Sequence, residues 1–143
     1  MRILLIEDDP ILALTFASTL EQGGHEVLGI AHTAEEAYDL ASAHPDAQLA
    51  LADVNLNGKD EGIEVVRDLR MRFGIPALFV SGQVAVVRQH AHLALGLMKK
   101  PFPPADLLKA VHAVRQDGQA GLDAQALPPA LTLYARCPVG TAS

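Results

Sequence analysis

The stretch that most constrains the fold runs from Leu49 to Gly62 and reads Leu-Ala-Leu-Ala-Asp-Val-Asn-Leu-Asn-Gly-Lys-Asp-Glu-Gly. Its first four residues form an apolar run without polar alternation, which is typical of a strand covered on both faces in a parallel sheet. The run ends at Asp53, and turn-forming Asn and Gly residues follow. Ligand sites in such sheets lie just beyond the carboxyl ends of the strands, so we expect Asp53 to belong to a functional site.

Apolar periodicity and turn residues predict strands and helices that alternate along the chain. Asp9 is expected to cap the first helix with Pro10 at its first position, and Thr33 to cap the second with Glu36 as its capping-box partner. The predicted strands span 2–6, 25–31, 49–52, 75–80 and 97–99, and the predicted helices span 10–22, 34–43, 63–74, 84–95 and 105–115.

This alternation predicts an α/β fold: a flavodoxin-like, doubly wound, five-stranded parallel sheet of order 2-1-3-4-5 with helices on both faces. Residues 1–117 are expected to form one domain, and residues 118–143 a C-terminal tail with no separate output domain. The apolar alternation from Ala130 to Tyr134 leaves three alternatives for the tail: it is disordered, it docks on the domain, or it docks on a second copy.

Composition excludes several classes of function. The chain of 143 residues carries a net charge of −6 and has no Lys/Arg stripe, which argues against nucleic acid or an anionic membrane surface as its main partner. Its one cysteine, Cys137, cannot form an intrachain disulfide. No apolar stretch approaches the length of a membrane span, and no signal peptide follows Met1. We therefore expect a cytoplasmic protein.

In the predicted sheet, Glu7, Asp8 and Asp53 converge on one edge, where their mutual repulsion favours a bound divalent cation with hard oxygen ligands, and Mg²⁺ is the expected ion. Ser81 and Lys100 follow adjacent strands at the same edge and are placed to hold phosphoryl oxygens. Aspartate is a known covalent acceptor of phosphate, so the set predicts phosphoryl transfer to Asp53. No P-loop is present, and a nucleotide is not the obvious donor.

Through four motifs in register, the chain resembles the receiver domain of bacterial two-component response regulators. The motifs are Leu-Ile-Glu-Asp-Asp, Leu-Ala-Asp-Val-Asn-Leu with a following Gly62, Phe-Val-Ser-Gly and Lys-Lys-Pro-Phe, and the resemblance covers roughly Arg2 to Arg115. It implies Asp53 as the phosphoacceptor, Asp8 as a direct Mg²⁺ ligand, Glu7 as a ligand through metal-bound water and the main-chain carbonyl of Asn55 as a further ligand.

The resemblance also implies Ser81 as the switch hydroxyl and Lys100, not Lys99, as the lysine that pairs with the phosphoryl group. The donor is then a phosphohistidine on a sensor histidine kinase or a histidine phosphotransfer protein, and output passes through a downstream protein partner, with a homodimer left open. The resemblance implies that the protein is not an enzyme, apart from catalysing its own phosphorylation and its own dephosphorylation.

Two departures from the family pattern concern the switch. Leu97 stands where the family usually has Tyr or Phe, three residues before the lysine. The interval from Ser81 to Lys100 is also short, which suggests a short or distorted fourth helix. The stretch Pro76 to Gly82 is similar to a subgroup whose fourth strand ends in Phe-x-Thr-Gly, and that subgroup is often paired with unconventional kinases.

Each feature also has a plainer interpretation. The acids at 7–9 suit a helix N-terminus, Asp53 a strand-end turn and Lys100 a solvated surface. The six histidines are scattered along the chain and do not suggest a metal site. At the level of the whole chain, the first rival function is a non-switching receiver that serves as a constitutive interaction module. A second is a flavodoxin-like enzyme, against which the lack of a Gly-rich loop after the first strand argues.

Overall fold

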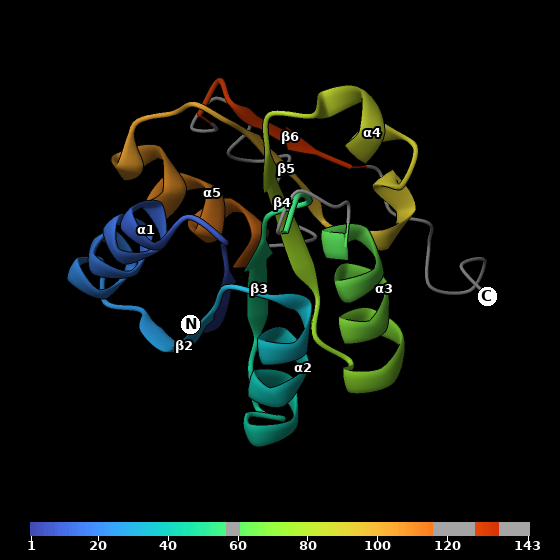
Figure 1. The fold of residues 1–143 in the computed structure, drawn as a ribbon. Coiled ribbons are helices and arrows are strands. Elements are labelled where there is room, and N and C mark those ends of the chain that lie inside the picture. The colour runs from blue at the N-terminus through green and yellow to red at the C-terminus, as the bar shows by residue number, and fades with distance from the viewer. Residues whose placement is uncertain (57–60, 116–127, 135–143) are drawn as a thin grey trace.

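The structure, a computed structural model, describes residues 1–56, 61–115 and 128–134. Within these ranges the chain forms a sheet of six strands in the order β2-β1-β3-β4-β5-β6, with helices on both faces (Figure 1). The helices of the described ranges are all too short or too polar to cross a lipid bilayer. The elements are β1 (Arg2–Ile6), α1 (Pro10–Gln22), β2 (Glu26–Ala31), α2 (Ala34–Ala43), β3 (Leu49–Ala52), α3 (Glu61–Phe73), β4 (Ala77–Ser81), α4 (Val84–Arg88), η1 (Ala91–Leu93, a 3₁₀ helix), β5 (Gly96–Lys99), α5 (Pro104–Arg115) and β6 (Leu131–Leu133).

The first two helices begin where their caps predict. The Asp9 carboxylate accepts hydrogen bonds from two main-chain N–H groups in the first turn of α1, which has Pro10 at its first position. The Thr33 hydroxyl accepts a hydrogen bond of 3.1 Å from the N–H of Glu36 at the start of α2. These side chains satisfy donors that a helix N-terminus leaves without intrahelical partners.

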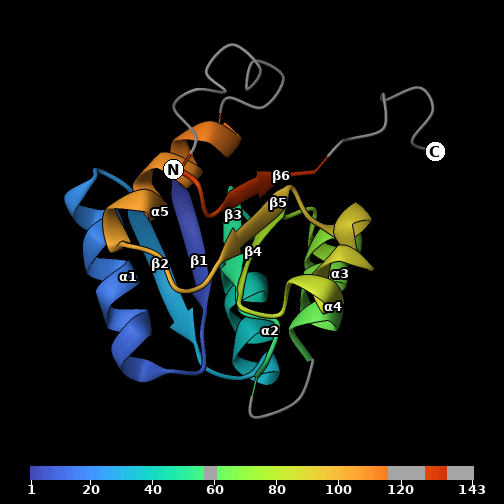
Figure 2. The ribbon, with the colours of Figure 1, turned by 90° about the horizontal axis from the view of Figure 1, so that it is seen from above.

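The core is built on both faces of the sheet because side chains alternate along each strand. In β3, Leu49 and Leu51 pack on the face covered by α1 and α5, whereas Ala50 and Ala52 pack on the face covered by α2 and α3. Figure 2 shows α1 and α5 on one side of the sheet and α2, α3 and α4 on the other. β3 is therefore buried on both faces, as its unbroken apolar run predicts.

The helix predicted over residues 84–95 is much shorter in the structure. α4 ends at Arg88, and the chain continues through the separate 3₁₀ turn η1 before β5. Val84, Val86 and Val87 are β-branched residues that favour a helix weakly, and Val84 follows a cap residue whose side chain makes no capping hydrogen bond. The short interval between Ser81 and Lys100 indicated this outcome better than the apolar pattern did.

The sheet also has one strand more than the five predicted. The strands β1 to β5 are parallel and follow the predicted order, but residues 131–133 add β6 antiparallel to β5 at the edge of the sheet. Part of the stretch predicted as a tail is thus integrated into the fold. The predicted boundary at 117/118, the turn residues Asn57 and Gly58, and Cys137 lie outside the described residues.

Gly62, in the first turn of α3, lies against the backbone that follows β3. Its N–H donates a hydrogen bond of 2.8 Å to the carbonyl of Val54. A Cβ atom at this position would collide with the carbonyl oxygen of Asp53 and with the main chain of Val54. The absence of a side chain therefore allows α3 to approach the segment that carries Asp53.

We expect Gly62→Ala to destabilise the protein by about 1–3 kcal/mol, because the new methyl group overpacks against main-chain atoms that cannot turn away. Urea denaturation measures the change. Gly82→Ala is the control, because a Cβ there would have only the Lys100 carbonyl oxygen nearby, at 3.8 Å. Equal stability of Gly62→Ala and the unaltered chain would contradict this account of the close approach.

Candidate functional site

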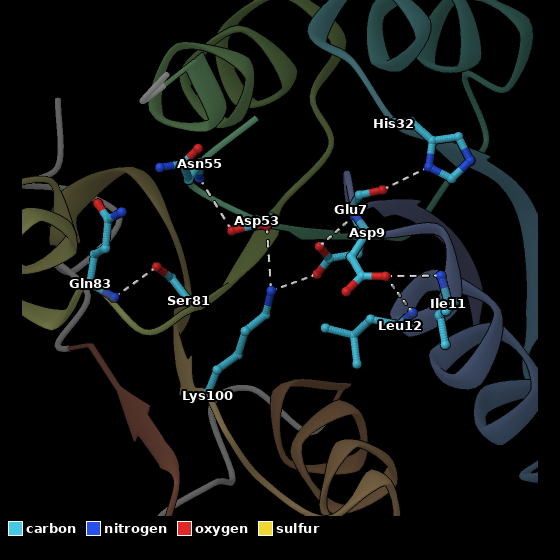
Figure 3. A network of polar contacts seen from close by, with 10 residues as sticks. All are labelled: Glu7, Asp9, Ile11, Leu12, His32, Asp53, Asn55, Ser81, Gln83 and Lys100. Carbon is cyan, nitrogen blue, oxygen red and sulfur yellow. Dashed lines mark hydrogen bonds and ion pairs between the residues drawn. The ribbon is translucent and has the colours of Figure 1, made fainter. Parts of the chain in front are cut away.

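The carboxyl ends of β1, β3 and β5 bring acidic and basic side chains together. The Lys100 ammonium group lies 2.7 Å from Glu7 Oε1 and 3.4 Å from Asp53 Oδ2 (Figure 3). Carboxylate oxygens of Glu7, Asp8 and Asp53 all lie within 4.8 Å of one another. Residues separated by up to 93 positions in the sequence thus form one charged cluster, as the strand order predicts.

The register of the sheet explains this convergence. Ile6 pairs with Ala52, so Glu7 and Asp53 leave their strands at the same level, and the Asp53 N–H donates a 2.9 Å hydrogen bond to the Ile6 carbonyl. Lys100 follows β5 in the same way and donates its N–H to the Ser81 carbonyl at 3.0 Å. Parallel neighbouring strands end at one edge, which places their following side chains together.

Burial makes this cluster electrostatically unusual. Glu7 is 2% exposed and Asp53 7% exposed. Burial raises the pKa of Glu7 to about 7, although the hydrogen bond from Lys100 acts in the opposite direction. Burial likewise raises the pKa of the Asp53 carboxyl group, while the charge of Lys100 acts to lower it.

Lys100 responds in the opposite sense to its surroundings. Burial by itself lowers the pKa of its ammonium group, but the hydrogen bond to Glu7 and the negative charge of Asp53 outweigh that effect, and the pKa is raised. Lys100 therefore remains a cation at neutral pH and partly compensates the buried acids. Lys99, its neighbour, is exposed.

The three carboxylates suit a divalent cation. Mg²⁺ prefers oxygen ligands about 2.1 Å away in octahedral geometry, which puts neighbouring ligand oxygens about 3 Å apart and opposite ones about 4 Å apart. Oxygens within 4.8 Å of one another approach this spacing, and they come from two buried side chains and the half-buried Asp8. The three carboxylates therefore fit the expected ion. In this structure the Lys100 ammonium group contacts two of them, those of Glu7 and Asp53.

The remaining predicted site residues occupy different places around the cluster. The Asn55 N–H donates a 3.2 Å hydrogen bond to Asp53 Oδ1 and so helps to orient that carboxylate. Ser81 is buried at the end of β4, and its hydroxyl oxygen accepts a hydrogen bond from the Gln83 N–H at 3.0 Å. Leu97 is buried in the core on the face of the sheet covered by α2, α3 and α4. Leu97 is therefore a packing residue of the core in this structure.

His32 is a neighbour of the site that sequence reasoning missed. It directly follows β2, and its Nδ1 lies 2.9 Å from the main-chain carbonyl oxygen of Glu7. A carbonyl oxygen can only accept, so Nδ1 carries the proton in this contact. The signal was its position, because the pairing of Ile6 with Ala31 puts the next residue of each strand side by side.

The chain matches a known family of protein domains. The sequence profile of the response regulator receiver domain matches residues 3–112, which is most of the chain. The chain belongs to this family. The receiver-domain resemblance drawn from the four sequence motifs is thereby confirmed, and the family consists of signalling domains.

Known relatives of the receiver agree with this assignment. The chain is 35% identical to the phyllosphere-induced regulator PhyR of Methylorubrum extorquens over 107 residues, which cover 73% of this chain and 40% of the relative. It is 36% identical to the cell cycle transcriptional regulator CtrA of Caulobacter vibrioides over 126 residues, which cover 84% of this chain and 53% of the relative. The receiver thus spans about half the length of these relatives or less.

Solved structures show the same fold. The signal receiver domain of a modulated diguanylate cyclase from Desulfovibrio desulfuricans is 25% identical, with a TM-score of 0.70 over 85% of this chain and 97% of that domain. The response regulator PhyR from Brucella abortus is 28% identical, with a TM-score of 0.66 over 86% of this chain and 51% of that protein.

The raised pKa of Glu7 predicts a pH dependence of stability. Between pH 4.5 and pH 7 the folded receiver holds a proton on Glu7 that the unfolded chain has released. Stability conferred by this group is therefore present at the acid end and is lost as the pH rises through that window. Without divalent ions, we expect the free energy of unfolding of the receiver to fall relative to that of Glu7→Gln over this range.

Urea denaturation in the presence of a chelator, at a series of pH values, measures this difference. Glu64→Gln removes an exposed carboxylate from α3 and controls for the loss of one negative charge. If the free energy of unfolding of the receiver, minus that of Glu7→Gln, stays constant or rises with pH, Glu7 is not held in its protonated form.

Proposed function

We propose that this receiver is a phosphorylatable signalling domain in which Asp53 accepts a phosphoryl group from a phosphohistidine donor. The strongest support is the Lys100 ammonium group between the buried carboxylates of Glu7 and Asp53. This arrangement holds a nucleophilic carboxylate beside a permanent cation and next to a set of oxygen ligands. The chemistry is the loading and unloading of the domain itself, not the turnover of a separate metabolite.

In the proposed transfer, an Asp53 oxygen attacks the phosphorus atom as the bond from phosphorus to the donor imidazole nitrogen breaks. The imidazole leaves with the bonding electron pair and takes up a proton, and the product is an acyl phosphate. Lys100 holds Asp53 in its anionic form and donates hydrogen bonds toward the phosphoryl oxygens. The Asn55 N–H orients the Asp53 carboxylate for this attack. Hydrolysis of the acyl phosphate by water returns the free carboxylate.

We assign Glu7, Asp8 and Asp53 as the residues that hold Mg²⁺, with the main-chain carbonyl of Asn55 as a further ligand. When bound, the ion neutralises charge on the phosphoryl oxygens. The ion and Lys100 would then share the acidic cluster, and Lys100 would exchange its contact with Asp53 for one with the phosphoryl group.

We further propose Ser81 and Leu97 as parts of the switch. Ser81 ends β4 at the same edge as the acidic cluster, and its hydroxyl now bonds to the Gln83 N–H at the start of the segment leading to α4. Turning this hydroxyl toward a phosphoryl oxygen would release that N–H and shift α4. Leu97 packs in the same core as Val87 of α4, so a displacement of α4 would repack it. Ligand binding then shifts a balance between two packings.

The proposed partners are proteins. A sensor histidine kinase or a histidine phosphotransfer protein would supply the phosphoryl group, and the activated receiver would contact a downstream protein. Support comes from the net charge of −6, which disfavours nucleic acid, and from a relative in Bartonella quintana described as an anti-anti-sigma factor, a name that refers to regulation through proteins.

The rival function is a constitutive interaction module that keeps the acidic cluster but does not switch. Two observations favour it: Leu97 is an aliphatic core residue at the position of the usual aromatic partner, and α4 has only five residues. Loading experiments separate the two functions.

We expect mass spectrometry after incubation with acetyl phosphate and Mg²⁺ to show the addition of one phosphoryl group. Asp53→Asn should abolish the addition, because an amide is not a nucleophile toward phosphorus, and a chelator should suppress it. Lys100→Ala should slow loading by about 100-fold, because the cation beside the developing charge is lost. Lys99→Ala, at the exposed neighbouring position, and Asp39→Asn, on the exposed face of α2, are the matched controls. Absence of any addition would favour the constitutive module.

The switch has its own test. NMR spectra recorded with beryllofluoride and Mg²⁺ should show shifted amide signals at Ser81, Gln83 and Leu97, whereas signals from α2 stay in place. Ser81→Ala should remove the shift at Leu97 while loading continues. Unchanged signals around Ser81 and Leu97 in a loaded receiver would refute the switch and leave the phosphoacceptor assignment intact.

A further inference from the structure

β6 covers the edge of the sheet at β5. The two strands are antiparallel, with residue pairs Gly96–Leu133, Leu97–Thr132 and Met98–Leu131. The pairing extends beyond the ladder at both ends, because the Lys99 N–H donates to the Ala130 carbonyl at 2.9 Å and the Tyr134 N–H donates to the Leu95 carbonyl at 3.0 Å. Figure 2 shows β6 beside β5, outside the five parallel strands. The whole length of β5 thus has a partner on this side.

The side chains of this segment are sorted by the two faces of the sheet. Leu131 and Leu133 pack with Met98 on the face covered by α1 and α5. Tyr134 packs on the opposite face, against the core that contains Leu97. The edge therefore recognises an extended segment by its apolar residues as well as by main-chain hydrogen bonds.

Gly96 adapts β5 to a strand at this position. A Cβ atom on Gly96 would collide with the carbonyl oxygen of Thr132 and approach the Cα atom of Leu133 to 3.2 Å. Gly96 does not have a positive φ, so its backbone conformation does not call for glycine. The missing side chain instead makes room for the neighbouring strand.

β6 is only weakly stabilised by its pairing and burial. It is a three-residue strand with a neighbour on one side, and only Leu131 of its ladder residues is buried, whereas Thr132 is exposed and Leu133 half-buried. Ordering such a segment costs backbone and side-chain entropy that offsets much of the gain from burying it. A short edge strand of this kind can be exchanged for another without unfolding the domain.

We propose that the β5 edge is a docking site for an extended strand of a protein partner, and that β6 is its built-in competitor. The strand that fits runs antiparallel to β5, has aliphatic residues at two alternate positions and carries an aromatic residue next, as in Leu131 to Tyr134. A partner must displace β6, whose attachment to the same chain gives it an effective concentration on the order of millimolar. The docking edge ends at Lys99, next to Lys100 of the charged cluster.

A peptide with the sequence of residues 128–134, labelled with fluorescein, tests this proposal by fluorescence anisotropy against full-length chains. Leu131→Asp should release β6, because the carboxylate cannot enter the apolar face, and should bind the peptide at least about tenfold more tightly than the unaltered chain does. Thr132→Asp is the matched control: it puts the same charge on the exposed side of β6 and should bind as weakly as the unaltered chain. Adding Gly96→Ala to Leu131→Asp should abolish binding.

Amide hydrogen exchange reports the release directly. The Tyr134 N–H should exchange at least about tenfold faster in Leu131→Asp than in the unaltered chain or Thr132→Asp. Failure of folded Leu131→Asp to bind the peptide, or binding that survives Gly96→Ala, would overturn the proposal. If Leu131→Asp does not fold, Gly96→Ala alone decides: faster exchange at Tyr134 supports the shaped edge, and unchanged exchange refutes it. None of these measurements depends on phosphorylation of Asp53.

Discussion

The contact of the Lys100 ammonium group with Glu7 and Asp53 is the interaction on which the proposed chemistry depends. Two nearly buried carboxylates repel one another and lose hydration, and a cation at 2.7 Å and 3.4 Å compensates part of that cost. The compensation is partial, because the pKa values of both acids remain raised. A site in this condition favours any additional cation that can be shared among the acids, which is why the same cluster suits Mg²⁺.

This contact exists only because three strands end at one level. Alternation along the strands directs Leu51, Leu5 and Met98 to the face under α1 and α5, and the charged residues follow two positions later at the edge. Ser81 lies two residues after Phe79 in β4, and Phe79 packs with Leu97 on the opposite face. The chemistry at the edge and the packing under α4 are therefore connected through the ends of β4 and β5, a few residues from each other.

The side of the sheet formed by β5 is covered by a strand that local sequence does not specify. An uncovered β5 would present free main-chain groups and apolar side chains to other chains. β6 satisfies those groups with its own main chain, and Gly96 gives it room. The short α4 contacts β5 from one face of the sheet and the added β6 pairs with β5 at its open side, so the same strand carries both departures from the predicted architecture.

Much of the fold and of the site could be predicted because the signals are local. Apolar runs mark the strands, Asp9 and Thr33 mark the first two helix starts, and acids placed directly after strands must meet once the strand order is known. The choice of Lys100 over its neighbour Lys99, which is exposed in the structure, came from the resemblance to the receiver family. Each of these inferences needs only a few adjacent residues.

The tertiary structure alone decided the features that depend on distant contacts. Whether Leu131 to Tyr134 pairs with β5 depends on the space beside Gly96. The contact of His32 with Glu7 and the burial that raises the pKa of Glu7 likewise arise from residues far apart in the chain. Sequence thus determined which groups reach the edge, whereas packing determined their distances, their charge states and what covers β5.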